Sequence, residues 1–239
     1  MSPLFKFRYV LFTMLLLPLQ SCAVPFWYSA EPIEGWVADA ETNQPIEGVI
    51  VTANWQLKGG LEGGNPVGQM MVMETVTDKI GHYYFPGWGP KLRPWNGKLK
   101  DESPQILMFK SGYSFAGLEN KLTMEVLRGE LENPLRSDWT GETIKMGKFR
   151  GTQKEYKELF EDFNHTLERI ATDQPTDCHW KNLQKTIRAM NQERNRLVTL
   201  GTNPNTLSSI DNELLMNDKF YTEKGGCGSP KKFFGEFKQ

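Results

Sequence analysis

The spacing of apolar residues changes at Gly151, and this change divides the chain into two parts. From residue 33 to residue 149, apolar and polar residues alternate in short runs between turn-forming residues. Such runs predict short β-strands. After Gly151, apolar residues recur every three or four positions, which predicts amphipathic helices. Because no helices are predicted between the strands, the pattern indicates a mainly β protein: an antiparallel β-sandwich followed by an α-helical C-terminal segment.

Two stretches of the β part predict long loops. Residues 58–69 contain five glycines and one proline, and residues 88–104 contain three prolines. Long loops in compact domains are often functional, and exposed aromatic rings in them anchor partner proteins or sugars. We therefore predict a binding loop in the second stretch; the alternative is that this loop folds back onto the sandwich. Its candidate residues are Trp88, Arg93, Trp95 and Asn96.

The C-terminal part, residues 151–239, predicts three helices. Thr152 and Glu155 have the spacing of a capping box at the start of the first helix. The second runs over about residues 177–201, and a third, shorter helix follows it. Residues 225–239 predict irregular structure. Two arrangements stay open for the apolar stripe of these helices: it packs on the sandwich, or it is offered to a partner.

The first 21 residues have the features of a secretory signal. Lys6 and Arg8 precede a short apolar run, and small residues follow it. The run is too short for a normal membrane-spanning helix, which needs about 20 apolar residues. We therefore predict that residues 1–21 are removed on export. No apolar run after Cys22 reaches the length of a membrane span.

The residues at the predicted cleavage site resemble the lipobox of bacterial lipoproteins. These residues are Leu19, Gln20, Ser21 and Cys22. The resemblance implies that Cys22 becomes the first mature residue and carries acyl chains, so that the membrane is a partner through the N-terminal lipid. It also implies that residues 22–32 are a lipidated tether. Ala23 follows Cys22 where aspartate would retain the protein at the inner membrane. In a host with two membranes, the implied location is the outer membrane, facing the periplasm.

The other two cysteines are Cys178 and Cys227. If Cys22 is acylated, they form the one intrachain disulfide that is available, and exported compartments are oxidising. That bond would close a loop of roughly 50 residues and add about 4 kcal/mol to the free energy of unfolding.

The β part, residues 33–150, resembles a carboxypeptidase regulatory-like domain of the transthyretin-like sandwich type. The resemblance depends on Gly35 to Asp39, Thr42, Pro45, Ile46, Gly48 to Val51 and Thr77 to Phe85. It implies a module that is usually non-catalytic and that supports other domains or binds a partner. It does not extend to residues 151–239.

Other classes of function lack their sequence signals. The net charge is −1, so we expect no nucleic-acid partner. The H-E-x-x-H and G-x-S-x-G patterns are absent, and we predict no catalytic residues and no enzyme. Cys178, His179 and Cys227 match no zinc spacing, so we predict no metal and no cofactor.

These observations predict a membrane-anchored, exported lipoprotein that acts as a non-catalytic binding or assembly module of the bacterial cell envelope. The expected partner is an envelope protein or a glycan. The alternative is a carbohydrate- or peptidoglycan-binding protein that uses the loop aromatics.

Overall fold

The computed structural model describes residues 27–59, 64–122, 136–172 and 177–235. The predicted signal segment and the predicted lipidation site, Cys22, lie outside these residues. The strands of the described part all precede its helices. They are β1 (Trp27–Ala30), β2 (Ile33–Asp39), β3 (Ile50–Gly59), β4 (Asn65–Val76), β5 (His82–Phe85), β6 (Trp88–Leu92), β7 (Gly97–Leu99), β8 (Gln105–Phe109), β9 (Ala116–Leu118) and β10 (Thr143–Met146).

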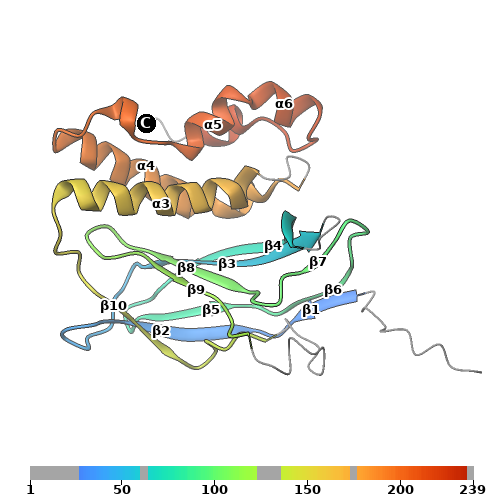
Figure 1. The fold of residues 1–239 in the computed structure, drawn as a ribbon, viewed down its shortest axis with the longest axis horizontal. Coiled ribbons are helices and arrows are strands. Elements are labelled where there is room, and N and C mark those ends of the chain that lie inside the picture. Colours follow the sequence, from blue (N-terminus) through green and yellow to red (C-terminus); the bar gives the residue numbers. More distant parts are fainter. Residues whose placement is uncertain (1–26, 60–63, 123–135, 173–176, 236–239) are drawn as a thin grey trace, which may run out of the picture.

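The strands form two stacked sheets, and the helices lie over one of them (Figure 1). One sheet has the order β10-β2-β5; the other has the order β4-β3-β8-β9, with β7 also paired to β3. Strands β1 and β6 form a separate two-stranded ribbon. The predicted antiparallel sandwich is confirmed, with one departure: β10 pairs with β2 in parallel. This pairing joins the last strand to one of the first strands. Patterns of residues that are close together in the sequence do not determine such a long-range pairing.

The core between the sheets follows from the alternation of side chains along β3. Val51, Ala53 and Trp55 point into it and are fully buried, whereas Thr52 and Asn54 point to the helical side. On the opposing sheet, Val37 and Phe85 complete the same cluster. This period of two is the signal that predicted the sandwich.

A second core lies between the β3–β8 sheet and the helices. Val72, Leu107 and Phe109 enter it from the sheet, and Phe160 and Trp180 from the helical layer. The helical segment therefore packs on its own sandwich, which decides between the two arrangements that the sequence left open. The helices are α3 (Gln153–Thr172), the 3-10 helix η1 (His179–Leu183), α4 (Gln184–Thr199), the 3-10 helix η2 (Pro204–Thr206), α5 (Ile210–Met216), α6 (Asp218–Glu223) and α7 (Pro230–Gly235).

The predicted capping box is present at the start of α3. The Thr152 backbone N–H donates to the Glu155 carboxylate at 2.6 Å, and the Glu155 N–H donates to Thr152 Oγ1 at 3.3 Å. This is the reciprocal geometry of a capping box.

The prediction of irregular structure over residues 225–239 is wrong in part, because α7 forms there. Its Phe233 ring packs on Trp180, a long-range contact that local composition does not reveal.

The C-terminal residues are also tied to the helical layer by a disulfide between Cys178 and Cys227. The bond joins the residue before η1 to the segment between α6 and α7. The predicted pairing of these two cysteines is thus found.

The predicted loop of residues 58–69 is mostly strand. Strand β3 continues to Gly59 and β4 begins at Asn65, so a long hairpin replaces most of the loop. Residues 60–63 lie outside the described part. Glycine is needed here because β7 crosses close to the hairpin: a Cβ on Gly59 would lie 2.3 Å from the Asn96 carbonyl oxygen. Gly59, one of the glycines that predicted a loop, thus permits close contact between strands.

We expect Glu74→Ala to lower the free energy of unfolding by about 1–2 kcal/mol. The Glu74 carboxylate, on β4, accepts from the backbone N–H groups of Lys185 and Thr186 at 2.8 and 2.9 Å, and so joins the sheet to the first turn of α4. Urea denaturation measures the change. Glu158→Ala, which removes an exposed carboxylate from α3, is the matched control and should stay within about 0.5 kcal/mol. Equal values for both variants would contradict this role of Glu74.

Candidate functional site

The predicted binding loop, residues 88–104, is a structured arm at one end of the sandwich. It contains β6, a turn over residues 93–96, and β7. Strand β6 pairs with β1, and β7 pairs with β3. Backbone hydrogen bonds therefore attach β7 to the sheet that contains β3, and β6 to the N-terminal strand β1.

Trp88 is not exposed, so the expectation of an exposed ring at this position is wrong, and the alternative that the loop folds back onto the sandwich holds for this residue. Its side chain is only 8% exposed, and its ring meets Trp55 edge-on, with ring centroids 5.5 Å apart. Pairing of Trp88 with Ala30 places it over the end of the sandwich core. The sequence alone did not reveal this, because β1 lies in the segment predicted to be a tether. In the described part of that segment, Tyr28 and Ala30 are buried.

The other three predicted residues surround the turn between β6 and β7. Arg93 Nε donates to the Gly97 carbonyl oxygen at 3.0 Å, so its guanidinium closes the turn. Asn96 is exposed, and its backbone faces Gly59. Trp95 is 97% exposed, so its ring projects from the turn with almost no contact to the domain. Of the four predicted residues, Trp95 is the one whose placement suits an anchor for a partner.

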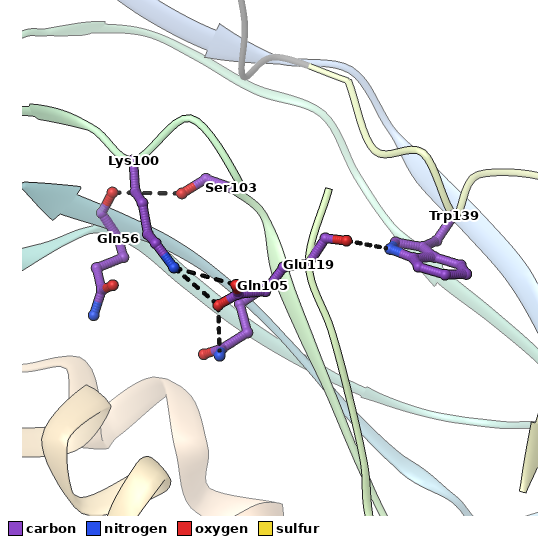
Figure 2. Close-up of polar contacts among 6 residues, drawn as sticks. All are labelled: Gln56, Lys100, Ser103, Gln105, Glu119 and Trp139. Carbon is purple, nitrogen blue, oxygen red and sulfur yellow. Dashed lines mark hydrogen bonds and ion pairs between the residues drawn. The ribbon is translucent and has the colours of Figure 1, made fainter. Parts of the chain in front are cut away.

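A polar network braces the arm where it returns to the sheet. The Lys100 backbone N–H donates to the Gln56 carbonyl oxygen at 2.8 Å, and its ammonium lies 3.1 and 3.2 Å from the two Glu119 carboxylate oxygens. Figure 2 shows Gln105 donating to the same carboxylate, while Trp139 Nε1 donates to the Glu119 carbonyl oxygen. These groups are paired with one another, so the network holds the arm in place and is not an open ligand site.

Two further exposed apolar residues lie on the β1–β6 ribbon, and β6 ends three residues before Trp95. Trp27 on β1 is 59% exposed and Leu92 on β6 is 61% exposed. They are direct partners in the β1–β6 ribbon, and side chains of directly opposed residues lie on the same face. We call Trp27, Leu92 and Trp95 together the ribbon surface. The sequence analysis missed Trp27 and Leu92, because Trp27 lies in the segment predicted to be a tether and Leu92 was not singled out in the predicted loop.

A second surface missed by the sequence analysis is a cleft in the helical layer, beside the disulfide. It has a volume of about 520 Å³, and its lining includes Trp180, Lys181, Arg188, Lys232 and Phe233. No acidic side chain is among its lining residues, so its chemistry suits an anionic group. Lys232 and Phe233 come from the segment predicted to be irregular, which explains why the cleft was not foreseen.

His179 lies at the junction of η1 and the sheet. Its Nε2 is 3.0 Å from the Gln69 carbonyl oxygen. Burial lowers the pKa of His179, while the contacts with Gln69 and Asp177 oppose this effect.

In the described part of the chain, no three His, Cys, Asp or Glu residues are grouped to hold a metal ion. Within the same residues, no helix has the length and apolar character needed to cross a membrane.

Comparison with known proteins gives structural matches alone. No family model matches the chain, and neither does any curated protein. Among solved structures, 3-chlorocatechol 1,2-dioxygenase from Rhodococcus opacus is similar over 51% of this chain, with 16% identity and a TM-score of 0.29; the match covers 60% of the dioxygenase. The C-terminal domain of the shaft pilin SpaA from Lactobacillus rhamnosus matches 51% of the chain and 99% of its own length, with 12% identity and a TM-score of 0.23.

A third match is the dioxygenase domain of a dioxygenase–carbohydrate-binding protein fusion from Streptomyces. It covers 55% of this chain and 85% of the domain, with 18% identity and a TM-score of 0.25. Because two of these matches are enzymes, our prediction that the chain is not an enzyme is contradicted, and we withdraw it. The TM-scores are too low to assign any reaction to this chain.

Proposed function

We propose that this chain is an exported lipoprotein that is anchored in a membrane by acyl chains on Cys22 and acts as a binding module of the cell envelope. The lipobox resemblance supports the anchor. The disulfide supports export, because such bonds persist in oxidising compartments. It also leaves Cys22 as the one cysteine outside the pair, as lipidation requires. Ala23 favours the outer membrane, on the periplasmic side.

We further propose that the sandwich is a carboxypeptidase regulatory-like module of the transthyretin-like type. Two turns that carry the resemblance have the geometry that their residues favour. The Asp39 carboxylate accepts from the Thr42 N–H at 2.9 Å, and hydrogen bonds from this turn lower its pKa. Gly81 has a φ of 75°, and a Cβ there would lie 2.4 Å from the Val37 carbonyl oxygen. These are supports for the family proposal, which depends on the residues quoted for it.

The observation that carries the binding role is the exposure of Trp95. A tryptophan ring that is 97% exposed, on an arm fixed by two strand pairings, keeps a large apolar area in water. Such rings are frequent anchors in protein and ligand interfaces. The ribbon surface is therefore the proposed contact surface of the module.

The alternative partner, a carbohydrate or peptidoglycan, depended on Trp88 and Trp95 together. The burial of Trp88 removes one of these two rings. A glycan is retained as a partner to be tested at Trp95 alone, by co-sedimentation of purified sacculi with the wild type and with Trp95→Ala. Pelleting that requires Trp95 would favour the glycan.

Lipidation is tested by metabolic labelling in a bacterial host with an alkyne analogue of palmitate. We expect label on the wild type and none on Cys22→Ala, because that substitution removes the acceptor thiol. Mass spectrometry of the mature N-terminus should find acylated Cys22 as the first residue. Trp95→Ala is the control and should be labelled like the wild type. An unlabelled wild type with an intact, unprocessed N-terminus would contradict the proposed anchor.

A further inference from the structure

We propose that the ribbon surface docks on the anionic phospholipid interface of the membrane that holds the anchor. This inference rests on the proposed function, because the acyl chains on Cys22 bring the surface to the membrane. It names the partner of the contact surface and sets the orientation of the domain: the end with β1 and β6 faces the bilayer, and the helical layer remains free.

The first argument is the apolar chemistry of the surface. Trp27, Leu92 and Trp95 are among the most exposed large apolar side chains of the described residues. Trp27 and Leu92 are opposed in the ribbon, and Trp95 follows Leu92 by three residues, so the Cα atoms of Leu92 and Trp95 are at most about 11 Å apart. Tryptophan is enriched at the headgroup level of bilayers, where its apolar ring and polar N–H both find suitable surroundings.

The second argument is charge. Residues 83–100 contain four basic residues and no aspartate or glutamate. Lys98 is exposed on β7, and Arg93 is half-buried in its turn. Lys91 is also exposed, but it is opposed to Tyr28 and lies over the Trp88 ring, on the other face of the ribbon from Trp27 and Leu92. Lys100 is already paired with Glu119 and is not counted here. Basic side chains around exposed aromatic rings are attracted to anionic lipid headgroups.

The arm, residues 88–104, also contains two acidic residues, Asp101 and Glu102, so its four basic residues leave a net charge of +2. Asp101 forms an ion pair with Lys58, and Glu31 lies 3.9 Å from the Arg136 guanidinium. The whole chain has a net charge of −1, so a basic arm is a local feature and not a consequence of composition. Charge complementarity therefore favours an anionic surface as the occupant.

The third argument is the position of the anchor in the sequence. Four residues separate Cys22 from Trp27, and a chain of this length spans at most about 18 Å. Acyl chains on Cys22 would thus hold Trp27 within that distance of the membrane. A short tether also raises the local concentration of the surface at the bilayer, so weak intrinsic docking is sufficient.

The test uses the full, acylated protein in vesicles with Asn96→Cys as the labelling site. Cys178 and Cys227 are disulfide-bonded and Cys22 is acylated, so the new cysteine is the thiol available for an environment-sensitive fluorophore. Asn96 is exposed and its substitution leaves Trp95 in place. Lys154→Cys, on the exposed side of α3, is the matched control position.

In vesicles with anionic phospholipid and headgroup-labelled quencher lipid, we expect quenching at position 96 to be about threefold above that at position 154. Combining Asn96→Cys with Trp27→Ser, Leu92→Ser and Trp95→Ser should reduce quenching to the control level, while the protein still floats with the vesicles. Vesicles of zwitterionic lipid alone should reduce it as well.

Protein that floats with the vesicles but is quenched equally at both positions would overturn the docking proposal and leave the anchor intact. Protein that does not float and carries no acyl chain would instead overturn the proposed anchor, and the docking orientation with it. A fluorescence change at position 96 on addition of sacculi, with none on addition of anionic lipid, would assign the surface to a glycan and reject the membrane.

Discussion

Trp88→Ala is expected to lower the free energy of unfolding by about 3–5 kcal/mol, a loss typical of a large buried aromatic residue. The Trp88 ring covers the end of the inter-sheet core and packs edge-on against Trp55, which is 1% exposed. Removing the ring leaves a cavity and exposes its neighbours. Chemical denaturation of the soluble protein in a Cys22→Ala background, followed by circular dichroism, measures the difference.

Trp95→Ala is the matched control, since it removes the same side chain from the same arm. Its ring is 97% exposed, so the free energy of unfolding should change by no more than about 0.5 kcal/mol. The two variants compare a buried tryptophan with an exposed one on the same arm. Equal destabilisation by both variants would show that the described placement of the arm is wrong.

The second large effect is expected for the double variant Cys178→Ser/Cys227→Ser, which should lower the free energy of unfolding by about 4 kcal/mol. The bond spans 49 positions and ties the segment after α6 to the start of η1. Without it, the unfolded chain gains conformational freedom, and α6 and α7 lose their covalent link to the helical layer. We expect faster hydrogen exchange in α6 and α7 than in β3 and β8.

Denaturation with and without reductant provides the check. Reduced wild type should match the double variant, and Cys22→Ala should match the oxidised wild type. Two reactive thiols in the denatured, exported protein, or a double variant as stable as the wild type, would contradict the structural role of this bond.

The sequence predicted the structure correctly where that structure depends on residues that are close together in the chain. Alternation around Val51 predicted a strand with one buried face, and the pair Thr152 and Glu155 predicted the helix start. The turns at Asp39 and Gly81 likewise depend on residues that are close to them in the chain. Each of these signals is complete within about ten residues.

The errors arose where distant segments determine the outcome. Glycine near residue 59 was interpreted as a loop signal, although it permits β7 to approach β3. Trp88 was predicted to be exposed because the β1 strand that turns it inward was not foreseen. The same applies to α7, whose Phe233 is held by Trp180. The exposed ring of Trp95 was the part of the candidate site that sequence could identify.

The covering of the β3–β8 sheet by the helices has a consequence for anyone who shortens this chain. A fragment that ends near Gly151 would keep every strand of the described part. It would, however, expose the apolar side chains of Val72, Leu107 and Phe109 to solvent. An exposed apolar surface of this kind favours self-association. The boundary between the strand and helix patterns is therefore a poor site for truncation, because the β part and the helical part share a hydrophobic core.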